Sequence, residues 1–518
     1  MTALADLART SASVGASAGR LAKVRELAAF LKSLPPEDVD TAVHYLSGAL
    51  PQGKIGIGHA ALRAAAAQAP AVAETLSIAE VNRCVEALGA LRGGGSASAR
   101  STALRQLFAR ATKDEQDFML RLMLGELRQG ALEGIMIDAI AAAGDLPATL
   151  VRHASMYSKS LGEVATATLG EGAEALERFQ LEVFSPVSPM LAQTAADVGE
   201  ALSALPGEIA FEWKMDGARI QAHKLGHEVR LYTRNLNEVT AAVPEIVEAV
   251  REFPAHTLVL DGEAIAFGAG GRPQPFQITM RRVGRKLDVE KLRAELPIQA
   301  FFFDCLRAGQ ESITDRPTRE RFDALAGAVP AAALMPRLVT ASQAAARAFY
   351  DAAIAAGHEG VMAKSLDAPY AAGNRGSEWL KIKRAHTLDL VVLAAEWGHG
   401  RRTGKLSNLH LGARDPENGE FVMLGKTFKG LTDATLEWQT KEFLARETHR
   451  DAATVYVRPE LVVEIAFSDL QASIRYPGGL ALRLARVKRY RDDKGPVEAD
   501  TMESVRQIYA AQQGTPPA

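Results

Sequence analysis

The chain has 518 residues, of which 47% are hydrophobic, and a formal net charge of −2. At roughly 100–200 residues per domain, this length predicts about three domains with separate cores. The near-neutral charge excludes a uniformly basic or acidic protein, but it is compatible with a basic stripe on one face.

Signals for export or membrane insertion are not expected in this chain. The N-terminus is rich in Ala and Ser and lacks the continuous apolar core of a secretory signal. The Ala-rich runs near Ala64 and Ala331 are short and interrupted by polar residues, so they do not predict a membrane span. The two cysteines, Cys84 and Cys305, are far apart and too few for a zinc cluster, which indicates a reducing, cytoplasmic setting.

Residues 1–185 are expected to form an all-α domain. Apolar residues recur there at the spacing of an amphipathic helix, as in Leu21, Val24, Leu27 and Leu31. The same spacing returns through several further segments before residue 185. This part of the chain is therefore predicted to be helical throughout.

A proline-bearing linker, Phe184–Pro189, marks the next boundary, and residues 186–385 are expected to form a mixed α/β domain. Short β-rich runs alternate there with helical segments. These runs are residues 229–233, 257–260, 300–303 and 360–363.

Residues 386–518 have a third pattern, in which apolar strands alternate with turns. Examples are residues 388–393, 421–424 and 461–466. Short strands separated by turns are typical of a small β-barrel. We find no internal repeat, so the predicted fold is multidomain: α, then α/β, then β.

The most informative motif is K-x-D-G-x-R, from Lys214 to Arg219. Lys214 is predicted to be a nucleophile, because an amine attacks when it is neutral and a partly desolvated site near other cations lowers its pKa. Asp216 and Gly217 would form a tight turn, which would bring the positive charge of Arg219 back toward a bound phosphate or sugar. For an isolated lysine, a strand-edge position in solvent is the better interpretation. The four fixed identities, however, arise by chance in only roughly one in a few hundred chains of this length.

Three companion motifs follow in order. Asp261-Gly-Glu263 comes directly after an apolar run, and Glu359 precedes a short strand that ends at Lys364. Lys381 and Lys383 alternate along a strand, so both are expected on one face. Each motif is commonplace alone, but their order downstream of Lys214 is a strong composite signal.

The chemistry explains why these residue types belong together. Attack on the α-phosphate of ATP displaces pyrophosphate, so the site must stabilise phosphate charge while the nucleophile stays neutral. Lys381 and Lys383 would hold the α-phosphate and lower the pKa of Lys214. Glu263 and Glu359 suit Mg²⁺ or Mn²⁺, because these ions favour oxygen ligands.

An aromatic candidate and several basic clusters accompany these motifs. Phe303 is either a platform that stacks on adenine or a buried strand aromatic, and the sequence leaves both open. Any one basic cluster is better explained as a solvated face, but their joint presence favours phosphate contacts. The clusters are Arg281–Arg282 with Arg285–Lys286, Lys381–Arg384, Arg401–Arg402 and Arg486–Arg491.

This combination of motifs resembles the covalent nucleotidyltransferases, specifically the bacterial, three-domain, replicative-type form of the ATP-dependent DNA ligases. The resemblance covers nearly the whole chain and maps the lysine that carries AMP to Lys214. It also assigns contacts with ATP or AMP to a set of further residues. These are Glu212, Arg219, Arg234, Glu263, Phe303, Glu359, Lys364, Arg375, Lys381 and Lys383.

The resemblance extends to both ends of the chain. The last family motif corresponds to residues 483–494. The resemblance implies that this part is an oligonucleotide-binding (OB) fold, a mobile barrel from which Arg491 and Lys494 act in the first step. Leu484-Ala485 stands where many relatives have Phe-Pro, so barrel docking is expected to differ in detail. The helical part resembles the family's DNA-binding domain in the segments 53–58 and 120–128.

The implied activity is sealing of nicks in double-stranded DNA, with ATP as a substrate and Mg²⁺ or Mn²⁺ as the metal. The resemblance also implies a monomer that works in the cytoplasm at the nucleoid. An RNA ligase or capping guanylyltransferase would share Lys214 but would not explain the large helical domain. A catalytically inactive DNA-binding scaffold would explain that domain, but it would not require Lys214, Glu263 and Glu359 together.

Overall fold

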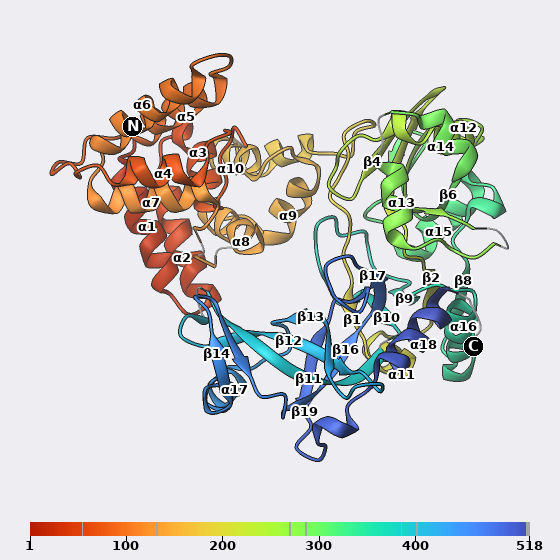
Figure 1. The fold of residues 1–518 in the computed structure, drawn as a ribbon. Coiled ribbons are helices and arrows are strands. Elements are labelled where there is room, and N and C mark those ends of the chain that lie inside the picture. The colour runs from red at the N-terminus through yellow and green to blue at the C-terminus, as the bar shows by residue number, and fades with distance from the viewer. Residues whose placement is uncertain are drawn as a thin grey trace.

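The computed structural model describes residues 1–513, with gaps at 54, 128, 131–132, 269–270, 285–286, 385 and 400–401. It shows a helical part, a mixed part and a strand-rich part, in the predicted order (Figure 1). Three of the predicted basic residues lie outside the described residues, as does one residue in each of the two predicted DNA-binding segments. These are Arg285, Lys286 and Arg401, and Lys54 and Arg128.

The N-terminal part consists of α-helices and one short 3₁₀ helix, which confirms the all-α prediction. Glu80 and Glu115 each complete a capping box at a helix start, and Gly125 ends α7 in a left-handed conformation. The elements are α1 Leu4–Ala16, α2 Arg20–Lys32, α3 Pro36–Leu46, α4 His59–Ala66, α5 Ile78–Ala90, α6 Ser96–Ala109, α7 Lys113–Leu124, α8 Glu133–Ala143, α9 Ala148–Tyr157, α10 Leu161–Gly170 and η1 Glu174–Arg178.

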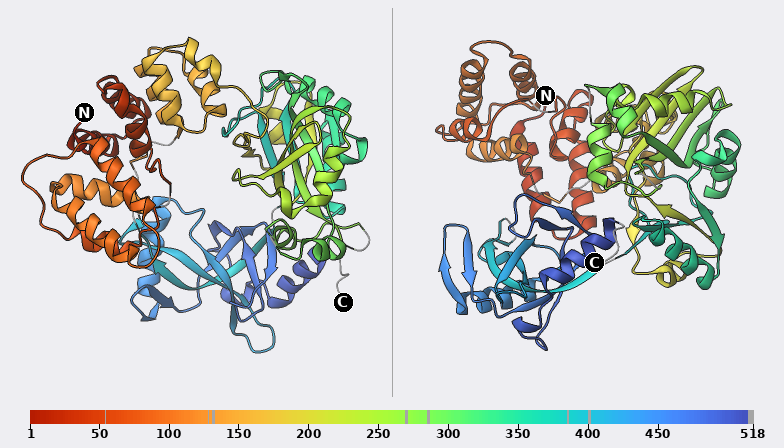
Figure 2. Two further views of the ribbon diagram at one scale, coloured as in Figure 1. Left: turned by 90° about the horizontal axis from the view of Figure 1, so that it is seen from above. Right: turned by 45° about the vertical axis from the view of Figure 1, so that its right-hand side comes forward.

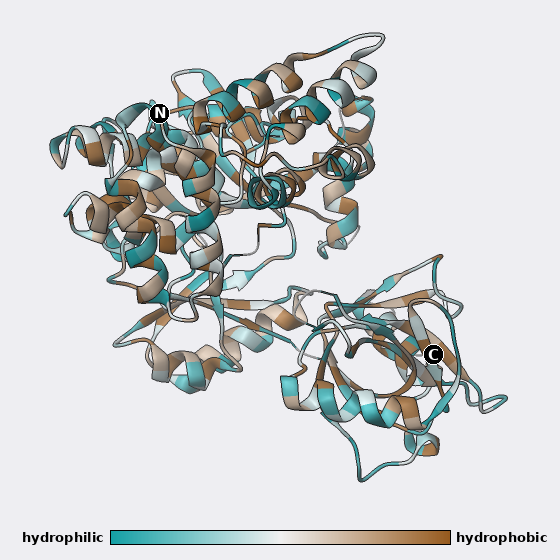
Figure 3. Ribbon diagram, turned by 90° about the vertical axis from the view of Figure 1, so that its left-hand side faces the viewer, coloured by the Kyte–Doolittle hydropathy of each residue, from teal (hydrophilic) through white to brown (hydrophobic). Residues whose placement is uncertain are grey.

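The core of this part is formed by apolar stripes of the helices, which Figure 3 shows as brown bands beside teal ones. On α2, Leu27 and Leu31 are buried as predicted. Leu21, however, is 76% exposed, because it lies in the first turn of α2 beyond the packed stripe. The predicted stripe is therefore one turn too long.

The mixed part contains two five-stranded sheets, with orders β1-β10-β9-β2-β8 and β4-β3-β5-β6-β7. All four predicted β-rich runs lie in strands. The strands are β1 Gln193–Thr194, β2 Ile209–Lys214, β3 Ala218–Leu225, β4 Glu228–Thr233, β5 Thr257–Ala266, β6 Ile298–Ala308, β7 Glu311–Ser312, β8 Arg337–Thr340, β9 Gly360–Ser365 and β10 Trp379–Lys383. The helices are α11 Val198–Ala204, η2 Thr240–Ala242, α12 Pro244–Arg251, α13 Phe276–Val283, α14 Val289–Glu295, α15 Thr318–Ala328, η3 Ala331–Ala333 and α16 Gln343–Ala355.

The K-x-D-G-x-R motif joins these two sheets. Lys214 ends β2 in the first sheet, and Ala218 begins β3 in the second. Gly217 lies in the connection between them, where an added Cβ would come within 2.3 Å of the Ala264 carbonyl oxygen. Glycine is therefore required for the two sheets to approach each other at this point.

The C-terminal part is a strand-rich barrel with helix α17 between its third and fourth strands, as expected for an OB fold. The long strand β11 pairs with β12 and bends to pair with both β15 and β16. The elements are β11 His386–Trp397, β12 Leu406–Arg414, β13 Phe421–Thr427, α17 Asp433–Ala445, β14 Glu447–Arg450, β15 Thr454–Val457, β16 Val462–Phe467, β17 Asp469–Ala472, β18 Leu480–Arg483, β19 Arg486–Tyr490, η5 Pro496–Glu498 and α18 Met502–Gln513.

The three parts form a ring in the view of Figure 2 (left), with the helical and strand-rich parts next to each other at one end. Helix α9 contacts the mixed part through His153 and Tyr157, which bond to Asp315 and Thr314 at 3.0 and 2.5 Å. Leu181 lies in the core of the mixed part, although it precedes the predicted linker. No helix among the described residues is long and apolar enough to cross a membrane.

Candidate active site

A cavity of about 690 Å³ opens where the two sheets of the mixed part meet. Its lining includes Lys214 and the predicted nucleotide-contacting residues, which come from segments spread over the whole mixed part. These residues are Glu212, Arg219, Arg234, Glu263, Phe303, Glu359, Lys364, Arg375, Lys381 and Lys383. Arg234 and Arg375 are exposed side chains, whereas the others are buried or half-buried.

Lys214 lies at the end of β2 with its Nζ 2.5 Å from Oε2 of Glu359. Burial lowers the pKa of Lys214, but the contact with Glu359 and the charges of Glu263 and Asp216 outweigh it, so the pKa is raised. The predicted lowering of this pKa by Lys381 and Lys383 is therefore wrong for this arrangement. The reason is that the carboxylate of Glu359 stands between Lys214 and Lys383.

Glu359 is shared by two lysines. Its Oε2 lies 2.8 Å from Nζ of Lys383 as well as 2.5 Å from that of Lys214. Burial raises the pKa of Glu359, but the two lysines outweigh it and bring the pKa to about 2. The ammonium of Lys381 instead donates to the Ala192 carbonyl at 3.2 Å. Both β10 lysines line the cavity, which confirms that they share a face.

Arg219 is held in place by several acceptors. Its Nε and Nη2 donate to the two oxygens of Asp261 at 3.0 and 2.5 Å, and Nη1 donates to the Met190 carbonyl at 2.7 Å. Such paired contacts fix the plane of a guanidinium. The predicted contact with phosphate or sugar would therefore come from a side chain whose direction is already set.

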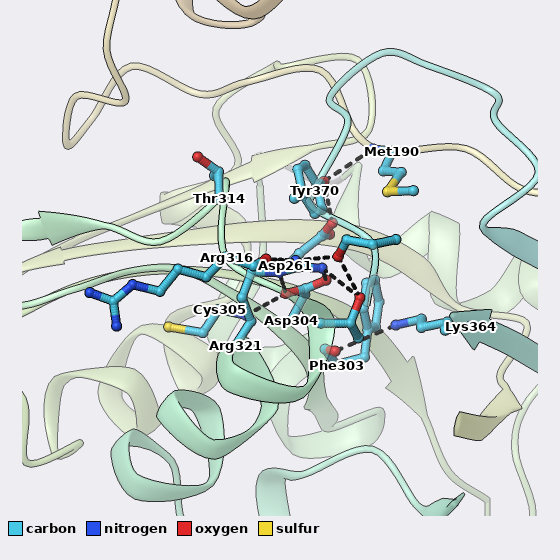
Figure 4. A network of polar contacts seen from close by, with 12 residues as sticks. Met190, Asp261, Phe303, Asp304, Cys305, Thr314, Arg316, Arg321, Lys364 and Tyr370 are labelled. Atoms are coloured by element: carbon cyan, nitrogen blue, oxygen red, sulfur yellow. Dashed lines mark hydrogen bonds and ion pairs between the residues drawn. The ribbon is translucent and has the colours of Figure 1, made fainter. Parts of the chain in front are cut away.

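A buried polar network lies beneath this wall of the cavity (Figure 4). Tyr370 donates to Asp261 at 2.7 Å, and burial, followed by the charge of Asp261, raises the pKa of Tyr370 well above its usual range. Asp304 and Arg321 form a fully buried pair at 2.8 Å. The sequence did not mark Tyr370 or Arg321 as part of the site, because their partners are distant in the chain.

Phe303 contributes a ring to the cavity wall and is only 8% exposed. Trp379 packs against it edge to face, with 6.1 Å between ring centroids. The ammonium of Lys364 lies 4.4 Å from the Phe303 centroid, a cation–π contact. The two interpretations of Phe303 are thus both compatible with its position, since it is buried and also lines the cavity.

Glu263 differs from the other carboxylates of the cavity. Among the described residues, it has no hydrogen-bond or ion-pair partner. Burial raises its pKa to about 8, although Lys214 and Arg219 lower it. A carboxyl group with this pKa is largely protonated at neutral pH, so it can donate a hydrogen bond as well as accept one.

A hairpin of the C-terminal part closes one side of the cavity. Arg483 of β18 donates to Asp216 at 2.7 Å and to Asp469 of β17 at 3.3 Å. Oxygens of Asp216, Glu359 and Asp469 lie within 4.8 Å of one another. This donor set fits Mg²⁺ chemically, but Glu263, which was predicted as a metal ligand beside Glu359, is not part of it. No sequence motif marks Asp469.

Comparisons with known proteins agree with this geometry. Three family models match the chain: "ATP dependent DNA ligase domain" over residues 189–383, "ATP dependent DNA ligase C terminal region" over 402–494, and "DNA ligase N terminus" over 68–141. A "Probable DNA ligase" of Anaeromyxobacter sp. (strain Fw109-5) is 59% identical over 511 residues, which cover 98% of each chain. The chain belongs to the ATP-dependent DNA ligases.

Other relatives support the same assignment. A "Probable DNA ligase" of Sorangium cellulosum is 52% identical and covers 98% of this ligase and 95% of its own length. A solved structure named "Pmar-Lig_PreS3" covers 94% of this ligase with a TM-score of 0.61 and 18% identity. At that identity, the likeness concerns the fold alone.

Two predicted residues of the ligase lie away from the cavity. Arg491 and Lys494 both donate to Oδ2 of Asp389 on β11, at 2.8 and 2.6 Å. Arg491 also pairs with Asp493 at 2.6 Å. In this arrangement Arg483 of the barrel lines the cavity. Arg491 and Lys494, at the end of the last motif, instead bind to Asp389 of the same barrel.

One residue of the first basic cluster was interpreted incorrectly. Arg282 is fully buried, where it pairs with Glu245 at 2.9 Å and donates to the Ala242 carbonyl. It therefore stabilises α13 against α12 and is not available to a phosphate. Arg489 of the last cluster, in contrast, is exposed and pairs with Glu464 at 2.7 Å.

Proposed function

We propose that this ligase seals nicks in double-stranded DNA through a covalent intermediate on Lys214. The nitrogen of Lys214 attacks the α-phosphate of ATP and pyrophosphate leaves. AMP then passes to the 5′-phosphate of the nick, and the 3′-hydroxyl displaces AMP to join the strand. The proposal includes a monomer working in the cytoplasm at the nucleoid.

The observation that carries the proposal is the convergence on one cavity of a lysine at a strand end, further cations and a buried aromatic ring. The cations Arg219, Lys381 and Lys383 are placed to stabilise charge on phosphate oxygens. The carboxylates of Asp216, Glu359 and Asp469, whose oxygens lie within 4.8 Å of one another, would hold Mg²⁺ or Mn²⁺, which would neutralise phosphate charge when bound.

The test is labelling with [α-³²P]ATP, followed by a chase with nicked DNA. We expect acid-stable label on the protein, its transfer to the 5′-phosphate and a sealed strand. Label from GTP instead of ATP would favour a capping guanylyltransferase, and a chase that works on nicked RNA alone would favour an RNA ligase. No label with either nucleotide would favour the remaining alternative, a catalytically inactive DNA-binding scaffold.

The first reaction should depend on pH through Lys214. Its raised pKa means that it is protonated at neutral pH, and only the neutral amine attacks, so the rate should rise about tenfold per pH unit above pH 6. Glu359→Gln removes the main cause of the raised pKa of Lys214. The labelling rate of this variant should therefore stop rising at a pH at least about one unit lower than in the unchanged protein, even if its maximal rate is smaller.

The measurement is the single-turnover rate of labelling at saturating ATP from about pH 6 to pH 10. Glu464→Gln, which removes a carboxylate paired with Arg489 on the barrel, is the matched control and should keep the profile of the unchanged protein. An unshifted profile for Glu359→Gln would show that Glu359 does not set the protonation of Lys214.

The helical part is proposed to hold the duplex. Removal of residues 1–179, which spares Leu181 in the core of the mixed part, should leave labelling by ATP within about threefold. Nick sealing at limiting DNA should fall by at least about 100-fold, because phosphate contacts that position the duplex are lost. The intact protein's affinity for nicked duplex should fall steeply with salt. Equal sealing rates for the intact and the truncated protein at limiting DNA would show that the helical part does not hold the duplex.

A further inference from the structure

Arg337 occupies a position behind the cavity that no sequence motif marks. It begins β8, and the pairing of β2 with β8 sets it directly opposite Glu212. Its Nε donates to Oε1 of Glu212 at 2.8 Å, and its Nη2 donates to the same oxygen. Arg337 itself is not part of the cavity lining, whereas Glu212 is.

The carboxylate of Glu212 is almost fully occupied. Its side chain is 2% exposed, and Oε2 lies 2.6 Å from Nζ of Lys364. A carboxylate accepts about four hydrogen bonds, and Arg337 and Lys364 supply three donors. The remaining acceptor position is therefore on Oε2. The bonds from Arg337 to Oε1 prevent the carboxylate from rotating, so this acceptor position keeps its direction.

The same two cations also hold the aromatic wall. Nη2 of Arg337 and Nζ of Lys364 lie 3.3 and 3.4 Å from the carbonyl oxygen of Phe303. Figure 4 shows Lys364 directed at this carbonyl. One cluster therefore fixes both the Phe303 ring and, beside it, a single open acceptor on Glu212.

This arrangement suits a flat base with an N–H donor on its edge. A purine lying against the Phe303 ring could donate its 6-amino group to Oε2 of Glu212. A purine without that group would leave a buried acceptor without a donor, which costs binding. The Arg337 guanidinium packs over the ring of Phe322 on its other side, so it is held firmly itself.

We propose that Arg337 is a positioning residue that sets the selectivity of the nucleotide site for adenine by fixing Glu212 and Phe303. The inference rests on the proposed function, in which this cavity takes ATP. Arg337 touches neither the nucleotide nor Lys214 and acts through the carboxylate and the carbonyl that it holds.

The experiment compares ATP with purine riboside 5′-triphosphate, which lacks the 6-amino group. The ratio of kcat/KM for labelling by the two nucleotides is measured in the unchanged protein and in Arg337→Gln. The unchanged protein should prefer ATP at least about tenfold. In Arg337→Gln that ratio should fall towards one, with kcat/KM for the analogue altered by less than about threefold.

Arg293→Gln is the matched control, because it removes an ion pair with Glu248 from the same part of the chain, away from the cavity. Its ratio should equal that of the unchanged protein. If Arg337→Gln does not fold, as judged by thermal melting, the ratio is read in Arg337→Lys. This variant keeps the charge without the planar pair of donors, and its ratio should fall by at least about threefold.

The possible outcomes separate the two ideas. Equal losses with both nucleotides, leaving the ratio unchanged, would show that Arg337 only joins β2 to β8 and would overturn the inference. An unchanged protein that uses both nucleotides equally would overturn it as well, since Glu212 would then not recognise the 6-amino group. Failure of the unchanged protein to label with either nucleotide would refute the proposed function instead.

Discussion

Lys214→Ala should abolish covalent transfer of AMP from ATP, a loss of at least about 10⁴-fold, because the substitution removes the attacking atom. The protein should stay folded. Glu359, the partner of Lys214, keeps Lys383 at 2.8 Å, so the substitution does not leave a buried charge without a counter-ion. Lys214 is also partly exposed at a strand end and contributes little packing.

The measurement is acid-stable label on the protein after incubation with [α-³²P]ATP, with circular dichroism as the check of folding. Lys214→Arg is the control, because it keeps the charge beside Glu359 but stays protonated and cannot attack. Both variants should retain some sealing of a nick that already carries AMP on its 5′-phosphate. Normal labelling of Lys214→Ala would refute the assignment of the nucleophile.

Arg491→Ala and Lys494→Ala should slow the reaction with ATP by about 100-fold or more, yet seal a nick that already carries AMP within about threefold. The reason is that the two cations would orient the pyrophosphate leaving group only when the barrel closes over the nucleotide. In the present arrangement they bind Asp389, so reaching ATP requires movement of the barrel.

The measurement compares the two rates in the same variant. Arg489→Ala is the matched control, because Arg489 lies two residues before Arg491, on β19, but is exposed and pairs with Glu464. It should change neither rate by more than about threefold. Little loss in either rate for Arg491→Ala would mean that Arg491 is an ordinary surface charge with no role in either step. Equal losses in both rates would mean that the barrel acts through DNA binding or folding.

Much of the fold could be predicted from the sequence, because the three parts differ in local pattern. Helical spacing, short β-rich runs and alternating strands each depend on neighbours in the chain. The same holds for the motif residues, since the turn at Gly217 and the alternation of Lys381 and Lys383 are local features. Errors occurred where exposure depends on distant packing, as for Leu21, which is exposed, and Arg282, which is buried.

The rest of the site depends on contacts between segments far apart in sequence. The carboxylate of Glu359 lies between Lys214 and Lys383, which no local pattern reveals and which reverses the predicted pKa shift. Arg337 and Asp469 reach the site through strand pairing and through domain docking, respectively. Such partners become visible only when the sheets and the barrel are placed relative to each other.

The bonds to Asp389 determine how much hydration Arg491 and Lys494 still have to lose when the barrel moves. The Arg491 side chain is only 14% exposed while it is bound to Asp389, so most of its water has been removed before any nucleotide arrives. Transfer from this carboxylate to a polyphosphate exchanges one anion for another instead of stripping a solvated cation. In the proposed first step, Asp389 would therefore compete with ATP for Arg491 and Lys494, and it would influence the affinity for ATP without contacting the nucleotide.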